Sequence, residues 1–327
     1  MRLSWCATLL AVGVMQTTAG QGPLVLTRSI DLPAVEGRID HLALDTARHQ
    51  LFVAALGNNT VEVLDLEKGV RTQSLPGFPE PQGIVALPEL NLVAVANGQS
   101  GDLRLLDMAT RQLKKTIPLS EDADNVRYDA VAKRLYVAHG SGALSAIDAV
   151  SGRVLGEVGL GGHPESFQLE HAGTRIFVNV PKAKHVAVID RQTMKLVTAW
   201  AVTGAEANYP MALDEEGHRL FVGCRRPAKV LVFDTRSGRQ IGTFDISGDT
   251  DDLFYDAARK RLYISCGDGF LDVFQQQDLG RFTPIAKVAT AAGARTSLFV
   301  PEQHRLYLAV PHRGDQKAEI RVYELQK

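Results

Sequence analysis

Cysteine, net charge and long apolar segments are all scarce in this 327-residue chain. Three cysteines are too few for a disulfide framework, and no Cys-x-x-Cys-His motif is present for haem attachment. A formal net charge of −1 disfavours a nucleic-acid-binding protein, because such proteins usually carry a strong basic excess. No segment after residue 20 is apolar over the roughly 20 residues that a membrane span needs. Hydrophobic residues still make up 45% of the chain, which is typical of a packed globular protein.

The first 19 residues have the pattern of a secretory signal peptide. Arg2 precedes the uncharged stretch from Leu3 to Met15, and Thr17-Thr18-Ala19 supplies the small residues of a cleavage site. The apolar part is too short to span a membrane. We therefore expect residues 1–19 to be removed and the remaining protein to be periplasmic or secreted.

The rest of the chain repeats a short apolar segment at intervals of 41 to 44 residues. The seven copies are Leu51-Phe52-Val53, Leu92-Val93-Ala94, Leu135-Tyr136-Val137, Ile176-Phe177-Val178, Leu220-Phe221-Val222, Leu262-Tyr263-Ile264 and Leu306-Tyr307-Leu308. A second segment alternates apolar residues and usually ends in an acid, at Asp65, Asp107, Asp148, Asp190, Asp234, Gln275 and Glu324. The last of its intervals is longer, which indicates an insertion in the seventh unit.

Each repeat contains four short strand patterns separated by polar turns, with no helical periodicity. This combination predicts an all-β fold, a seven-bladed β-propeller with four antiparallel strands per blade, over residues 20–327 as one domain. The seventh unit supplies three strands before the chain ends. We therefore expect the N-terminal strand, residues 24–32, to complete blade seven and close the ring.

Several of these segments resemble a known family. Pro81-Gln82-Gly83-Ile84, the stretch from Leu103 to Asp107, Lys115-Thr116-Ile117 and the stretch from Val186 to Asp190 resemble the "PxGIA…TVSVID…TKVxxTI" pattern of YVTN-repeat, YncE-like seven-bladed propellers. The Tyr-Val-Thr-Asn tetrapeptide itself is never intact; Phe177-Val178-Asn179 is among the nearest forms. The resemblance implies the propeller fold, whereas function differs among members.

Stacking the repeats by register places polar residues at one mouth of the central channel. In the propeller fold that the resemblance implies, the inner strand of each blade lines the channel. The positions just before or at the start of these strands therefore form two rings around one mouth. We expect a ligand site there, formed by Asp40, His41, Gln82, Asp124, Asn125, Glu165, Asn208, Tyr209, Asp251, Asp252 and Arg295. Loops on the same face add His163, Lys182, Lys184 and Arg225 among others.

One of these rings holds four carboxylates, those of Asp40, Asp124, Glu165 and Asp251. They repel one another, by roughly 2 kcal/mol for two charges about 8 Å apart. The repulsion can be answered by a bound cation, a cationic ligand, raised carboxyl pKa values, or the counterions Arg295 and His41. A divalent cation such as Ca²⁺ or Mg²⁺ would take its ligands from Asp124, Asn125, Glu165, Asp251 and Asp252. Alternatively, these acids stabilise the fold by accepting hydrogen bonds from backbone N–H groups of neighbouring turns.

Three functions fit this pattern. The first is an exported propeller that binds a small molecule or a protein partner at the channel mouth without catalysis, as a monomer. The second is a metal-dependent lactonase or esterase of the gluconolactonase type, whose metal would polarise a lactone carbonyl. The third is a propeller subunit of a periplasmic dehydrogenase system. Nucleic acid is not an expected partner, because Arg225-Arg226, Lys229 and the pair Lys182 and Lys184 are its only basic candidates. Cys224 and Cys266 are expected to be buried thiols.

Overall fold

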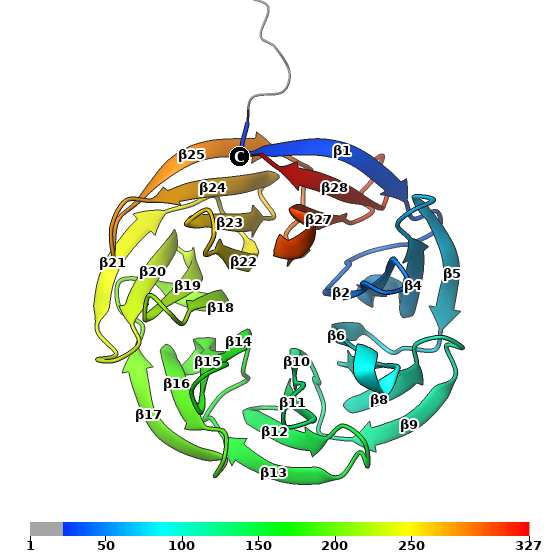
Figure 1. The fold of residues 1–327 in the computed structure, drawn as a ribbon, viewed down its shortest axis with the longest axis horizontal. Coiled ribbons are helices and arrows are strands. Elements are labelled where there is room, and N and C mark those ends of the chain that lie inside the picture. The colour runs from blue at the N-terminus through cyan, green and yellow to red at the C-terminus, as the bar shows by residue number, and fades with distance from the viewer. Residues whose placement is uncertain (1–21, 327) are drawn as a thin grey trace, which may run out of the picture.

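The computed structural model describes residues 22–326, so the expected signal peptide lies outside the described residues. Seven four-stranded antiparallel sheets, the blades, surround a central axis (Figure 1). This confirms the predicted all-β propeller. Within the described residues no helix has the length and apolar character of a membrane span.

Blades one to six each consist of four strands that are consecutive in the chain, ordered from the axis outward. Blades one to three contain β2 (Leu42–Asp45), β3 (Gln50–Ala55), β4 (Thr60–Asp65), β5 (Val70–Pro76); β6 (Pro81–Leu87), β7 (Leu92–Asn97), β8 (Asp102–Asp107), β9 (Leu113–Pro118); β10 (Val126–Asp129), β11 (Arg134–His139), β12 (Ala143–Asp148) and β13 (Val154–Gly159). Blades four to six contain β14 (Phe167–Leu169), β15 (Arg175–Val180), β16 (His185–Asp190), β17 (Lys195–Ala201); β18 (Glu206–Asp214), β19 (Arg219–Arg226), β20 (Ala228–Asp234), β21 (Gln240–Asp245); β22 (Thr250–Asp256), β23 (Arg261–Cys266), β24 (Phe270–Gln276) and β25 (Phe282–Ala289).

Blade seven combines both ends of the described chain. Its strands are β26 (Ser297–Val300), β27 (Arg305–Val310), β28 (Glu319–Leu325) and β1 (Leu24–Asp31), and four short 3-10 helices, η1 (Leu56–Asn58), η2 (Pro88–Leu90), η3 (Pro181–Ala183) and η4 (Pro301–Gln303), lie in loops. The outer strand β1 pairs antiparallel with β28, so that Leu24 faces Leu325 and Asp31 faces Glu319. The predicted closure by the N-terminal strand is therefore confirmed.

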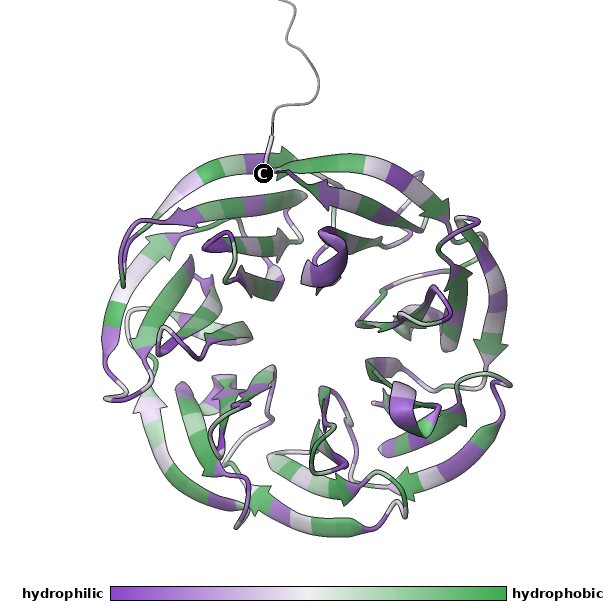
Figure 2. Ribbon diagram, viewed as in Figure 1, coloured by the Kyte–Doolittle hydropathy of each residue, from purple (hydrophilic) through white to green (hydrophobic). Residues whose placement is uncertain are grey.

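The second and third strands of each blade are buried, and this explains the two repeated sequence segments. Strand β3, for example, is buried from Leu51 to Ala55, because its two faces pack against neighbouring blades. The outer strand β5 is largely exposed and correspondingly polar. Figure 2 shows this contrast, with hydrophobic middle strands and mixed outer strands. The core is thus divided into apolar layers between adjacent blades.

The acid that ends most third strands caps the following turn. Asp65 Oδ1 accepts hydrogen bonds from the backbone N–H groups of Glu67, at 3.1 Å, and Lys68, at 2.9 Å. The same arrangement recurs at Asp107, Asp148, Asp190 and Asp234. Aspartate suits this position because its short carboxylate reaches backbone donors two and three residues ahead. These repeated acids therefore serve the fold.

The two cysteines among the described residues are free and buried. Cys224 lies in the apolar layer between blades four and five, and Cys266 in the layer between blades five and six. Burial raises the pKa of the Cys224 thiol to about 12, so this thiol stays protonated at neutral pH. The expectation of two buried thiols is confirmed.

Candidate functional site

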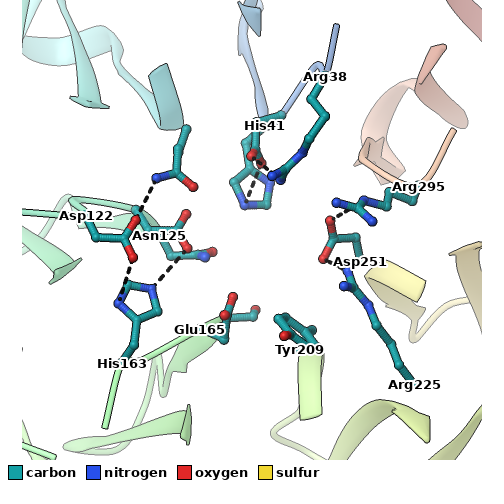
Figure 3. Close-up of a pocket in the computed structure, with 14 residues that line it drawn as sticks. Arg38, His41, Asp122, Asn125, His163, Glu165, Tyr209, Arg225, Asp251 and Arg295 are labelled. Atoms are coloured by element: carbon teal, nitrogen blue, oxygen red, sulfur yellow. Dashed lines mark hydrogen bonds and ion pairs between the residues drawn. The ribbon is translucent and has the colours of Figure 1, made fainter. Parts of the chain in front are cut away.

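A cavity of about 300 Å³ lies at one mouth of the channel, and all seven blades contribute to its wall (Figure 3). Its lining consists of polar side chains from the loops before the inner strands, from the starts of those strands and from the end of β19. They are Arg38, Asp40, His41, Gln82, Asp122, Asp124, Asn125, His163, Glu165, Ser166, Tyr209, Arg225, Asp251 and Arg295. The chain thus brings residues more than 250 positions apart to one pocket.

Nine of the eleven expected site residues line this cavity, and two do not. Asn208 is buried between blades, where its amide donates hydrogen bonds to Asn179 Oδ1 at 3.0 Å and to the His185 carbonyl at 3.1 Å. Asp252 accepts the Ser297 backbone N–H at 2.7 Å and faces a different cavity of about 500 Å³ along the channel. Both expectations of mouth-facing side chains were therefore wrong.

The reason is strand geometry. In blade six the adjacent residues Asp251 and Asp252 lie inside β22, and in blade five Asn208 and Tyr209 lie inside β18. The pairing of these strands shifts register at both places, between Asn208 and Met211 and between Thr250 and Asp252, and only Tyr209 and Asp251 line the mouth cavity. In blade three the equivalent pair, Asp124 and Asn125, precedes β10, and both residues line the cavity.

Five lining residues were not among the eleven expected site residues: Arg38, Asp122, His163, Ser166 and Arg225. His163 and Arg225 were nevertheless expected on the same face. Arg38, Asp122 and His163 stand two positions before the expected site residues Asp40, Asp124 and Glu165, respectively. Extending the same register outward by two residues would have found these three. Ser166 directly follows the expected site residue Glu165. Arg225 comes from the end of β19, which pairs with the start of the inner strand β18 and therefore lies at the same mouth.

On one side of the cavity, two aspartates flank an imidazole. His163 Nδ1 lies 3.4 Å from Asp122 Oδ2 and 2.7 Å from the Gly140 carbonyl, and Nε2 lies 3.7 Å from Asp124 Oδ2. Burial opposes the charge on His163, but the nearby Asp124 carboxylate, the Gly140 carbonyl and the charge of Asp122 outweigh it and raise its pKa to about 9. His163 is therefore a cation at neutral pH. Gln82 Nε2 donates to Asp122 Oδ1 at 3.1 Å, which fixes this carboxylate further.

On the opposite side, two arginines hold one aspartate. Arg225 Nη2 lies 2.5 Å from Asp251 Oδ1, and Arg295 Nε lies 2.9 Å from Asp251 Oδ2. Arg295 Nη1 also donates to both carboxylate oxygens of Asp249, at 2.8 and 3.0 Å. The guanidinium of Arg225 covers the Tyr209 ring, with its Cζ 4.0 Å from the ring centroid. Asp251 is thus fully neutralised and held rigid by its neighbours.

Asp40 and His41 form a third group at the edge of the cavity. Asp40 Oδ1 lies 3.7 Å from His41 Nε2, and Arg38 Nη2 donates to Asp40 Oδ2 at 3.4 Å. Burial, only partly opposed by His41, raises the pKa of Asp40 to about 6. His41 Nδ1 lies 3.8 Å from Asp252 Oδ2, so this imidazole separates the mouth cavity from the one further along the channel.

Two acceptors between these groups have no partner. The Asn125 side-chain oxygen is buried without a hydrogen bond to any described residue, and the whole residue is only 4% exposed. The carboxylate of Glu165 points into the cavity without a hydrogen bond or ion pair to the other residues drawn in Figure 3. Burial, followed by the charge of Asp124, raises the pKa of Glu165 to about 8. A buried acceptor without a donor is costly, so the Asn125 oxygen points to a missing donor. Glu165 is half-buried and lacks a cationic partner for its charged form.

The five candidate metal ligands do not converge. Asp252 faces away from the other four, and Asp251 is occupied by its two arginines. Within residues 22–326, no group of three or more His, Cys, Asp or Glu side chains is close enough to hold a metal ion. The free acceptors that remain, Glu165 and Asn125, are too few for the six to eight oxygen ligands that Ca²⁺ takes.

Comparison with known proteins supports the family already suggested by the repeats. No protein-family model matches the chain. Two relatives named YncE, from Salmonella typhimurium and Salmonella typhi, are each 27% identical over 210 residues, which is 62% of this chain. Together with the seven blades, this likeness supports a YncE-like propeller family. The chain is a seven-bladed propeller similar to these relatives.

The match spans 58% of the length of these YncE relatives. Among solved structures, this YncE-like propeller resembles a chain of the mitotic checkpoint complex with a TM-score of 0.79 at 15% identity, covering 100% of this chain and 99% of the other. It also resembles a chain of Kuenenia stuttgartiensis hydrazine synthase with a TM-score of 0.72 at 16% identity, covering 84% of this chain and 94% of the other. At such low identity these two likenesses show the propeller fold alone.

Proposed function

We propose that this YncE-like propeller is a binding protein that holds the ammonium group of a small organic cation at its channel mouth. The observation that carries the proposal is the pair of unpartnered acceptors, Glu165 and the buried Asn125 oxygen, in a cavity of about 300 Å³. That volume is at the lower end of the range for small-molecule sites. We also propose that the protein acts outside the cytoplasm, on the strength of its first 19 residues.

An ammonium group answers the needs of this cavity better than an anion or a neutral ligand. It donates up to three hydrogen bonds and carries the charge that Glu165 lacks a partner for. The cationic side chains of the wall already face carboxylates: Arg225 and Arg295 hold Asp251, and His163 lies between two aspartates. The acceptors without donors therefore define the charge of the ligand.

An ammonium group also suits the geometry better than a divalent metal. Its hydrogen bonds of about 2.9 Å tolerate acceptors spread over a funnel, whereas Ca²⁺ gathers its oxygens at roughly 2.3–2.6 Å. The carboxylates of this cavity belong to different blades and are mostly held by His or Arg partners. They are thus kept from closing on one small ion.

Isothermal titration calorimetry tests the proposal with hexylammonium, hexanol and hexanoate as probes, in buffers without amines. We expect hexylammonium to bind and the other two not to bind. Glu165→Gln should weaken hexylammonium binding by about 10-fold to 100-fold, because a charge-assisted hydrogen bond contributes about 1.5–3 kcal/mol. Glu121→Gln is the matched control, because Glu121 is an exposed acid of a loop before β10 that does not line the cavity.

Two results would count against the ammonium site. One is equal binding of hexylammonium and hexanol, which would mean that charge is not recognised. The other is tight binding of Ca²⁺ or Mg²⁺ together with lactone hydrolysis that EDTA abolishes. That second result would replace the binding function with metal-dependent hydrolysis.

A further inference from the structure

A side groove of about 400 Å³ adjoins the mouth cavity. His163, Glu165 and Tyr209 line both hollows, so they form the wall that the two share. The remaining residues of the groove come from η3 and the loop after it in blade four and from the start of β18 and the end of β19 in blade five. They are Pro181, Lys182, Lys184, Glu206, Ala207 and Arg226.

The groove has an excess of positive charge on its outer rim. Lys184 Nζ forms an ion pair with Glu206, which neutralises one cation. Lys182 and Arg226 are exposed and form no ion pair with any residue in the described part of the chain. These two cations line the groove alone, whereas Glu165 lines both hollows and Asn125 lines the mouth cavity alone. The two hollows therefore offer opposite charges to one ligand.

We infer that the ligand is a small zwitterion with separated charges, an aliphatic ammonium joined to an anionic group. This inference rests on the proposed ammonium site. The ammonium lies beside Glu165 and Asn125, and the anionic group lies beside Lys182 and Arg226. Tyr209 lines both hollows, so it lies where the short chain between the two charges would pass.

The orientation follows from charge. An anionic group in the mouth would meet Glu165 and the aspartates, whereas in the groove it meets Lys182 and Arg226. These two cations are solvated, so each contributes modestly, about fivefold in affinity or less. Their combined effect is a preference for the zwitterion over the simple amine, and not a new site of high affinity.

Calorimetry on the full protein tests this with three matched pairs: 4-aminobutanoate and butylammonium, 6-aminohexanoate and hexylammonium, and 8-aminooctanoate and octylammonium. The series covers different spans between the two charges. We expect at least one amino acid to bind about fivefold to tenfold more tightly than its amine. In the double variant Lys182→Ala with Arg226→Ala this preference should vanish while amine binding is unchanged. Lys317→Ala, which removes an exposed cation from the loop between β27 and β28, should keep the preference.

The outcomes separate the two proposals. If every amine binds as tightly as its amino acid, the ammonium site stands and the zwitterion is wrong. If the preference survives in the double variant, another part of the surface recognises the anion and the groove is wrong. If neither amines nor amino acids bind, the ammonium site fails and the zwitterion fails with it.

Discussion

Replacing Glu165 by glutamine is expected to stabilise the ligand-free protein. The side chain lines the mouth cavity without a cationic partner, and burial together with Asp124 raises its pKa from the ordinary 4.5 to about 8. Glutamine keeps the shape of the side chain and cannot ionise. The substitution therefore removes the cost of keeping a buried carboxyl at neutral pH while the same group in the unfolded chain is freely ionised.

The sign and the magnitude follow from linkage. Since the pKa is higher in the folded protein than in the unfolded chain, the contribution to stability is fully present below pH 4.5. It is lost progressively as the pH rises toward about 8. Each pH unit in this window costs about 1.4 kcal/mol, so the cost at pH 7 is on the order of 3 kcal/mol. Coupling to Asp124 and His163 spreads part of this cost over neighbouring groups, so the gain from glutamine is at most of this size.

Thermal denaturation at pH 5, 6, 7 and 8, at one scan rate and in buffers without amines, measures the effect. We expect Glu165→Gln to raise the Tm by up to about 5 °C at pH 7, with a smaller rise at pH 5 and a larger one at pH 8. The exposed control Glu121→Gln should follow the parent at every pH. Equal melting of Glu165→Gln and the parent at pH 7 and pH 8 would refute the reasoning, because Glu165 would then ionise without cost.

Three further predictions concern ring closure, a close backbone approach and the pH dependence of binding. Ile30→Ala in the closing strand β1 should destabilise the protein by about 2–4 kcal/mol, because Ile30 is only 1% exposed. Leu26→Ala in the same strand is the control and should change stability little, because Leu26 is 47% exposed. Thermal or urea unfolding measures both. Gly83→Ala in β6 should lower the free energy of unfolding by about 1–3 kcal/mol, because a Cβ there would lie 2.2 Å from the Asp124 carbonyl oxygen. Unchanged melting and unchanged hexylammonium affinity would show that the backbone at Asp124 moves aside without cost. Hexylammonium affinity should rise up to about tenfold per pH unit from pH 6 to pH 8 and then level off, because binding must release the proton of Glu165; a flat calorimetric profile would contradict this.

The fold could be predicted because its determinants are local and repeated. The segments beginning at Leu51 and its equivalents became the second strands, and those ending at Asp65 and its equivalents became the third strands. A strand packed on both faces needs an apolar run, and a tight turn needs a short acceptor, so each repeat carries both signals. The unpaired strand from Leu24 could likewise be assigned to the incomplete seventh unit.

The candidate site could be predicted only where aligning the seven repeats was enough to place a residue. Register placed nine residues at the mouth, because the repeats bring equivalent positions of different blades to the same height around the axis. It was wrong at Asn208 and Asp252, because it did not show that the inner strands of blades five and six begin before these residues. It also stopped short of Arg38 and Asp122, which stand two positions earlier in the same loops.

The sequence by itself therefore determined the number of blades, the closing strand and the ring of polar positions, since each of these depends on spacing along the chain. Only the tertiary structure decided how the charges of that ring are paired. Arg225 and Arg295, from blades five and seven, meet on Asp251 of blade six, while Glu165 and Asn125 are left without donors. Such pairings depend on distances of a few ångströms between side chains of different blades, and spacing along the chain does not encode them.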